Sequence, residues 1–191
     1  MSLVQWCERE FHPYEPYNSI SNLAFILVYF ASPKRNLLIA AIGCGSFYFH
    51  ITGSYLGEIL DELPMSLLAY QYYTVIARSH NRTYLAVLSM AWILYIRYKL
   101  YAIFTAIFTC QILLPLGMVI VQPKKMGMRK SYLVISWAYM ATAFSCWGYE
   151  RYLHATGQCP SDSGDFTYYL HSYWHVGAAL AHYYFMEASI Q

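Results

Sequence analysis

The sequence predicts an all-α protein, an integral membrane bundle of seven transmembrane helices. The chain of 191 residues is 58% hydrophobic, and only 12% of its residues are charged, against about 25% in an ordinary soluble domain. The charged residues are also spaced so that long stretches contain none of them, which is typical of helices that cross a bilayer. No repeat or long linker divides the chain, so residues 1–191 are expected to form a single domain.

Seven stretches without Asp, Glu, Lys or Arg give the expected spans in order. A polar segment, residues 1–17, comes before them and is not expected to be a cleavable signal peptide. The third and fourth stretches are shorter than the roughly 17 to 25 residues that a crossing needs. A sizeable loop is expected at residues 150–165, because Gly157, Pro160 and Gly164 interrupt regular structure. The seven stretches are residues 16–32, 36–57, 63–77, 83–96, 100–123, 131–149 and 166–186.

The charges predict the orientation of the bundle, because cytoplasmic loops carry an excess of Lys and Arg. The loops after the first, third and fifth spans hold most of the basic residues, namely Lys34, Arg35, Arg78, Arg82, Lys124, Lys125, Arg129 and Lys130. Most of the acidic residues fall on the opposite side. The N-terminal segment is therefore expected to be lumenal or extracellular and the C-terminus cytosolic. The net charge of +2, without a basic aromatic patch, gives no indication of nucleic-acid binding.

Histidines inside apolar spans predict a metal site, since ionisable groups at membrane depth usually mark function. His171 and His175 are four residues apart and so share one face of a helix, as do Ser46 and His50. Catalytic zinc typically takes three protein ligands and leaves one position for water, so His50, His171 and His175 would complete a suitable set. Asp61, expected near the outer membrane boundary, could orient or deprotonate a metal-bound water.

Each of these residues also has a purely structural explanation. A membrane histidine can hydrogen-bond to a neighbouring helix, and a small residue such as Ser46 can serve close helix packing. Asp61 and Glu62 could form an interfacial charge pair. His182 lies seven residues after His175, on nearly the same face, and is interpreted as structural.

Several short motifs occur together in an order that resembles the alkaline ceramidase family over nearly the whole chain. They are Trp6-Cys7-Glu8, Asn18-Ser19-Ile20-Ser21-Asn22, Gly45-Ser46-x-x-x-His50, Asp61-Glu62-Leu63-Pro64-Met65 and His171-x-x-x-His175. The resemblance implies a seven-helix intramembrane zinc amidase of the endoplasmic reticulum or Golgi that hydrolyses the N-acyl bond of ceramide. It implies that His50, His171 and His175 bind zinc, that Asp61 is the general base, and that Ser46 supports the site and stabilises the oxyanion. The implied partners are a ceramide-type lipid and the bilayer, with no obligate protein partner evident.

The same resemblance implies a calcium site in the N-terminal segment. The matching positions are the Trp6 carbonyl, Glu8, Glu10 and Glu15, and such oxygens suit calcium. The pattern departs from the family at Gln5, where an acidic ligand is usual, and in the shortened stretch between Glu10 and Glu15. An acidic segment that only reflects the charge rule for loops is the alternative interpretation.

A disulfide is also implied, with its pairing open. Cys7 and Cys159 both fall in segments expected to be lumenal, where oxidation is allowed. The family joins this N-terminal cysteine to one near the end of the sixth span, and Cys146 is a competing partner.

Two functions of other classes compete with the hydrolase. A seven-transmembrane lipid receptor or sensor of the same superfamily could keep the metal site with little turnover. A structural membrane protein with incidental histidines would hold no stoichiometric zinc.

Overall fold

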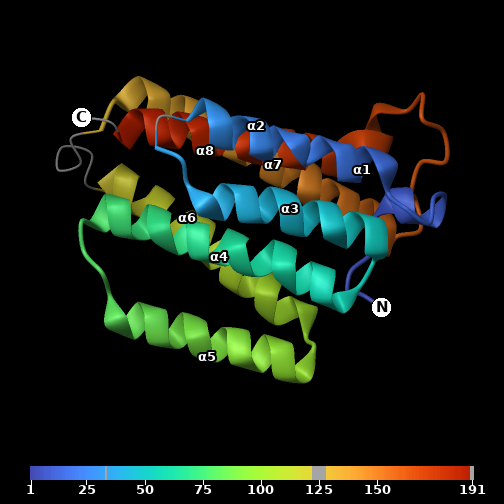
Figure 1. Ribbon diagram of the computed structural model, residues 1–191, viewed down its shortest axis with the longest axis horizontal. Helices are drawn as coiled ribbons and strands as arrows, with labels where there is room; N and C mark the ends of the chain where they lie inside the picture. Colours follow the sequence, from blue (N-terminus) through green and yellow to red (C-terminus); the bar gives the residue numbers. More distant parts are fainter. Residues whose placement is uncertain (33, 122–127, 190–191) are drawn as a thin grey trace.

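The computed structural model describes residues 1–32, 34–121 and 128–189, and these residues form helices and connecting loops without a β-strand (Figure 1). The prediction of an all-α bundle is thus confirmed. The elements are η1 (Cys7–Glu10), α1 (Pro16–Ser21), α2 (Leu23–Ala31), α3 (Leu37–Thr52), α4 (Tyr55–Ala77), α5 (Arg82–Tyr98), α6 (Tyr101–Val121), α7 (Lys130–Ala155), η2 (Phe166–Tyr169) and α8 (Leu170–Ser189).

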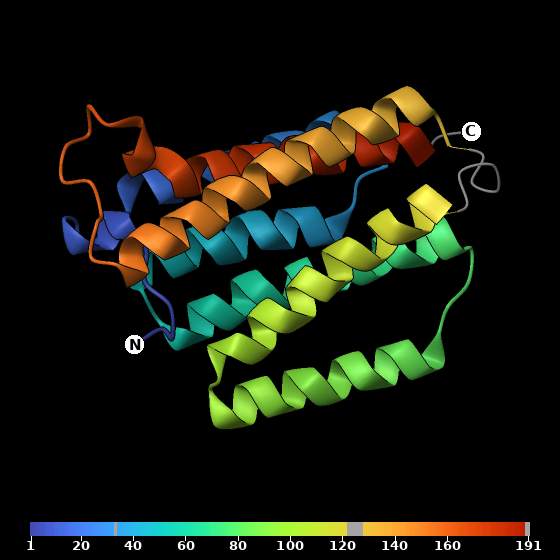
Figure 2. The same ribbon diagram turned by 180° about the vertical axis from the view of Figure 1, so that it is seen from behind.

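The long helices lie side by side along one common direction (Figures 1 and 2). The closest pairs are α7 with α8 and α3 with α4, and the short helices α1 and α2 lie against α3 and α8. Helix α5 is at one edge of the bundle, where it packs against α6. Two apolar clusters fill the interior, one around Phe25, Ile39 and Phe185 and one around Trp92, Phe104 and Trp174.

The turn between α3 and α4 is short and positions the residues of the later site. Helix α3 ends at Gly53, which has a positive φ of 57°, a conformation that glycine adopts without steric cost. Ser54 then begins α4 by accepting a hydrogen bond from the Gly57 amide on its side chain. Because only two residues separate the helices, the last turn of α3 lies beside the first turns of α4.

Helices α3 and α4 approach so closely that their backbones touch. A Cβ atom added at Gly45 would lie 2.1 Å from the carbonyl oxygen of Leu60. One added at Gly57 would lie 2.7 Å from the Phe49 Cα. Small residues permit such backbone contact between helices. Ser46 and Asp61, which follow Gly45 and Leu60 in sequence, are therefore brought together.

Several helix boundaries differ from the sequence-based expectation, including the end of the second expected span, which lies at Thr52 and not at residue 57. The first expected span is divided at Asn22 into α1 and α2. Helix α4 begins at Tyr55 instead of residue 63, because Glu58, Asp61 and Glu62 are buried within it. Helix α7 continues to Ala155, so the expected loop at 150–165 is wrong in its first part and begins at residue 156.

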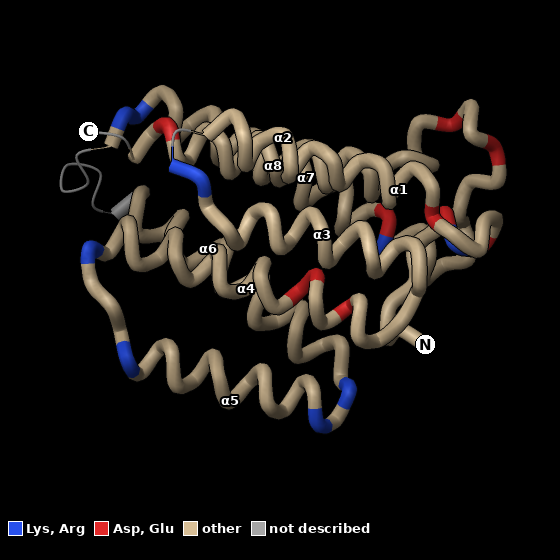
Figure 3. The backbone as a smooth tube through the Cα atoms, in the orientation of Figure 1, with Lys and Arg blue, Asp and Glu red and all other residues tan. Residues whose placement is uncertain are grey.

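Charge and hydropathy are unevenly distributed over the bundle. Many side chains that point away from it are apolar, and Leu27, Val134 and Phe30 are 68%, 67% and 63% exposed. Most Lys and Arg lie at the end that holds the C-terminus, while a few lie at the opposite end, for example where α5 ends, and most Asp and Glu lie at the end that holds the N-terminus (Figure 3). By length and hydropathy one described helix, α6 over Tyr101–Val119, qualifies as a membrane span. Lys124 and Lys125 lie outside the described residues.

Candidate active site

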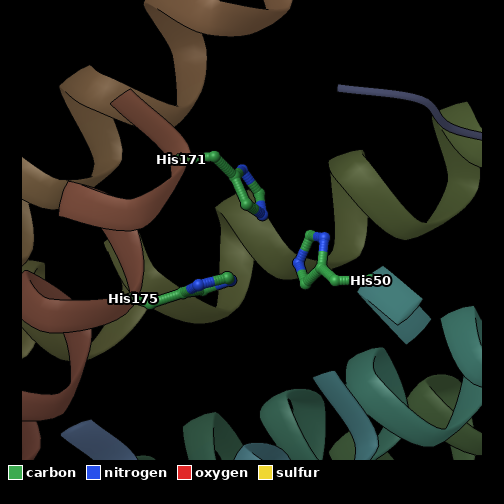
Figure 4. A group of neighbouring side chains, drawn as sticks. All are labelled: His50, His171 and His175. Carbon is green, nitrogen blue, oxygen red and sulfur yellow. The ribbon is translucent and has the colours of Figure 1, made fainter. Parts of the chain in front are cut away.

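Three histidine side chains meet inside the bundle (Figure 4). His50 extends from the last turn of α3, and His171 and His175 extend from the first two turns of α8. One possible ligand atom from each lies within 4.8 Å of the others, and all three residues are buried. This is the only such group of three or more His, Cys, Asp or Glu side chains among the residues that the structure describes.

An oxygen atom lies behind each imidazole, next to its Nδ1 atom. Glu15 Oε2 is 2.5 Å from Nδ1 of His50, and Ser21 Oγ is 2.8 Å from Nδ1 of His175. Ser21 donates its single proton to the Asn18 carbonyl, so its oxygen accepts the proton of His175. Oxygen partners of this kind fix the tautomer and orientation of metal-binding histidines. The Nε2 lone pair of each of these two imidazoles therefore faces away from Glu15 and Ser21 and can serve as an acceptor or a metal ligand.

The third imidazole has a carboxylate partner. Glu150 Oε2 lies 3.3 Å from Nδ1 of His171, within the distance of an ion pair but without the geometry of a hydrogen bond. The Trp6 ring packs on His171, with 3.7 Å between the ring centroids. The backbone N–H of Cys7 donates to the other Glu150 oxygen at 3.1 Å, so the N-terminal segment helps to hold this carboxylate.

The three residues fit a zinc ion, although they would suit several divalent transition metals. The Nε2 atom of His50 is buried and has no hydrogen-bond partner, and leaving such a group unpaired costs free energy. Neutral imidazole nitrogens are ordinary zinc ligands, and three of them leave a fourth position open. A metal would therefore satisfy an atom that the protein leaves without a partner.

Ser46 and Asp61 lie beside the histidines. Ser46 Oγ is 3.4 Å from Nε2 of His175, and both residues are buried. The Asp61 carboxyl, on the second turn of α4, interacts with the Ser46 hydroxyl and with His50. All five residues that the sequence singled out for catalysis and zinc binding are thus within one buried group.

A cavity of about 40 Å³ opens next to this group. Asp61, Tyr72 and His175 are the residues with ionisable side chains that line it, and the remainder of its wall is apolar. Representative apolar wall residues are Phe25, Ile39, Leu68 and Trp174. An apolar pocket with a few convergent polar groups is the usual form of a small-molecule site.

Comparison with known proteins places the chain in a family. The family model described as Ceramidase matches residues 1–190. The chain belongs to the ceramidase family. Alkaline ceramidase 1 of Mus musculus is 34% identical to it over 93 residues, which cover 39% of this chain and 34% of the relative. Alkaline ceramidase 1 of Homo sapiens is 33% identical over 93 residues, which cover 39% of this chain and 35% of the relative. The match thus spans about a third of the length of these curated relatives.

The calcium site expected from this family does not fit the N-terminal segment as it is folded here. Glu8 accepts hydrogen bonds from the backbone amides of Tyr17 and Asn18 at 2.8 and 2.9 Å. Glu10 is exposed and faces His154 at 3.6 Å. The carbonyl of Trp6 accepts from the Arg9 amide, and Glu15 contacts Arg9 and His50. The four expected ligands therefore have other partners and do not converge.

The environment of Glu15 favours its charged form. Burial acts to raise the pKa of Glu15, but the neighbouring His50 and Arg9 outweigh it, and the pKa lies below its usual value. Burial likewise raises the pKa of Glu8, where the amides of Tyr17 and Asn18 only partly oppose it. Glu15 is thus an ionised acceptor for the Nδ1 proton of His50.

Cys7 and Cys159 form a disulfide in this ceramidase-family chain, with 5.2 Å between their Cα atoms. The bond joins η1 to the loop between α7 and η2, close to the Glu150 carboxylate. Cys146, the competing partner, is a free thiol.

Sequence reasoning missed the residues that support the histidines. Ser21 was part of a quoted motif but had no assigned role, and Glu150 was expected in a loop. Glu15 was expected to bind calcium and not to face His50. For Glu15 and Glu150 the sequence shows only a carboxylate at the edge of a stretch without other charges. Such a position does not reveal which residue the carboxylate contacts.

Proposed function

We propose that this chain is an intramembrane zinc-dependent amidase that hydrolyses the N-acyl bond of ceramide, giving a sphingoid base and a free fatty acid. The observation that carries the proposal is the buried group of three histidines, each with an oxygen atom near its Nδ1, with Ser46 and Asp61 beside them. The family match over residues 1–190 supports the same chemistry.

Each residue of the site has a different role in the proposed amide hydrolysis. His50, His171 and His175 would hold zinc, which when bound supplies a Lewis acid and lowers the pKa of a coordinated water. Asp61 takes the proton from the attacking water as general base and then gives it to the amide nitrogen, so that the C–N bond breaks and the sphingoid base leaves as an amine. Ser46 donates a hydrogen bond to the amide oxygen as negative charge develops on it. The burial of both groups strengthens these interactions, because little water competes for them.

The bilayer explains why such a site would be built between helices. In this proposal α1 and α2 together form the first of seven spans, and α3 to α8 form the other six. The exposed apolar side chains and the charges gathered at the two ends support it (Figure 3). The N-terminal end, with its disulfide, would face the lumen of the endoplasmic reticulum or Golgi, and the C-terminus the cytosol.

The apolar cavity beside Asp61 and His175 is where we place part of the lipid chain of the substrate. Several helices line this cavity. In this proposal the exposed apolar side chains on the outside of the bundle contact the surrounding lipid. A ceramide could then keep its chains in an apolar environment while its amide reaches the polar group.

The test is fatty-acid release from a panel of ceramides by the purified protein, with zinc content measured on the same samples. Hydrolysis by the wild type, lost in His175→Ala together with zinc, is the expected result. Bound zinc without hydrolysis of any ceramide would instead favour the lipid receptor or sensor. Hydrolysis that persists in a zinc-free sample would overturn the proposed mechanism.

A further inference from the structure

The Arg9 side chain lies in the segment where a calcium ion was expected and contacts one of the expected ligands, Glu15. Its Nε atom donates to Glu15 Oε1 at 2.5 Å, and Nη1 donates to the Pro13 carbonyl at 3.0 Å. Its Nη2 atom donates to the carbonyl of His50 at 2.6 Å. Only 16% of the side chain is exposed. The guanidinium thus contacts one carboxylate and two carbonyl oxygens, a set of partners that resembles the oxygen ligands of a hard cation.

The oxygens that calcium would need are already bonded to protein groups. Calcium takes about 6 to 8 oxygen ligands. Glu8 is held by two backbone amides. Gln5 carries no charge, and its carbonyl accepts from Arg151 Nη1 at 2.8 Å. Glu15, the most deeply buried carboxylate of the segment, is shared between Arg9, His50 and Asn18.

From this arrangement we infer that the Arg9 guanidinium takes the place of a metal ion and positions the zinc ligand His50, so that this chain needs no calcium. The inference rests on the zinc site of the proposed function. An arginine is always charged at physiological pH, and its planar fork orients a carboxylate more firmly than a point charge does.

Arg9 holds His50 at two points. Through Nη2 it bonds the backbone carbonyl of His50, and through Glu15 it fixes the imidazole, because Oε2 of Glu15 faces Nδ1. The chain of contacts runs from guanidinium to carboxylate to imidazole and ends at the unpartnered Nε2 atom. Removal of the guanidinium would leave Glu15 buried near Glu8 with less compensating charge, which is costly.

Glycine at position 53 makes room for this arrangement. A Cβ atom at Gly53 would lie 2.4 Å from Arg9 Nη1. The residue also has the positive φ of 57° that ends α3. The turn after the first zinc ligand is therefore shaped to accept the guanidinium.

The experiment measures metal binding by the purified full-length protein. Calcium content is determined by elemental analysis after dialysis against millimolar calcium, and zinc affinity by competition with a chromophoric chelator with and without calcium. We expect the wild type to hold no stoichiometric calcium and to bind zinc equally well in both buffers. Arg9→Met should weaken zinc binding about 10- to 100-fold, as loss of an outer-shell partner does.

Arg129→Met is the matched control, because Arg129 also bonds a carboxylate and a carbonyl, both of Glu187, at the other end of the bundle. It should leave zinc affinity unchanged. Arg9→Lys keeps the charge without the fork and should fall between Arg9→Met and the wild type.

Two results would overturn the inference. One is a wild type with one tightly bound calcium per chain whose removal weakens zinc binding, a measurement that needs no variant to fold. The other is unchanged zinc affinity in Arg9→Met. Failure of the proposed function gives a different result, since the wild type would then either bind no zinc at all or bind zinc without hydrolysing any ceramide.

Discussion

At the scale of single residues, the site depends on the side chain that lies next to Nδ1 of each histidine. Glu15, Glu150 and Ser21 each place an oxygen next to Nδ1 of one imidazole. A histidine fixed in this way presents its other nitrogen with little loss of rotamer freedom on binding a metal. The three histidines could be singled out as a group from the sequence, by their spacing and by the family resemblance. Their partners could not, because Glu15, Ser21 and Glu150 reach the site from α7 and from the start and end of α1, elements distant in sequence.

His171→Ala should abolish both zinc binding and amidase activity, because two remaining imidazoles hold zinc far more weakly than three. The control is His182→Ala in the same helix, where a buried histidine pairs with the Tyr72 hydroxyl at 2.8 Å and does not reach the site. Zinc content and fatty-acid release, measured on both variants, test whether His171 is a zinc ligand. Retained zinc in His171→Ala would show that this residue is not a ligand.

Glu150→Gln should weaken zinc binding about 10- to 100-fold and lower activity in parallel, since the amide carries no charge to stabilise the His171 proton. Glu187→Gln, at the exposed pair with Arg129, is the control and should behave as the wild type. The measurement is zinc affinity by competition. Equal affinities for the two variants would mean that Glu150 has no part in the site.

At the scale of helices, close packing of α3 on α4 brings Ser46 and Asp61 into contact distance of the histidines. The stretches without charged residues predicted the approximate position of each long helix, and therefore the order of these helices along the chain. Their ends could not be predicted, because Glu58, Glu62 and Glu150 lie inside helices and are stabilised by partners from elsewhere in the chain. Tyr95 of α5, for example, donates its hydroxyl group toward Glu58 and Glu62 at 3.1 and 2.6 Å.

Gly45→Ala should destabilise the protein by about 1 to 3 kcal/mol, the usual range for overpacking, because its Cβ would collide with the Leu60 carbonyl. Activity should fall as Ser46 and Asp61 separate. Gly148→Ala in α7 is the matched control, since a Cβ there meets nothing within 4 Å and alanine favours helix. Thermal unfolding in detergent compares the two. A Gly45→Ala melting temperature equal to that of Gly148→Ala would refute the close contact.

At the scale of the whole molecule, the N-terminal segment closes one end of the bundle over the site. It contributes Trp6 against His171 and Arg9 and Glu15 against His50. The Cys7–Cys159 disulfide ties it to the loop after α7. The single domain and the lumenal side of this segment stay predictions from the sequence. Its docking onto the histidines depends on packing across the entire chain and could not be read from spacing.

Loss of this disulfide should loosen the segment and lower the free energy of unfolding by about 2 to 4 kcal/mol. Cys7→Ser should therefore lower the melting temperature and weaken zinc binding, because the Cys7 amide also supports Glu150. Cys146→Ser, which removes a free thiol, should change neither property. Identical unfolding curves for the two variants would exclude a stabilising role for the disulfide.

X-ray absorption at the zinc edge of the purified protein tests most directly whether the three histidines bind zinc. We expect one zinc per chain with about four nitrogen or oxygen neighbours at about 2.0–2.1 Å and the outer-shell scattering of imidazole rings, as for three histidines and one water. A sulfur-containing coordination sphere, or a sample without zinc after loading, would contradict it.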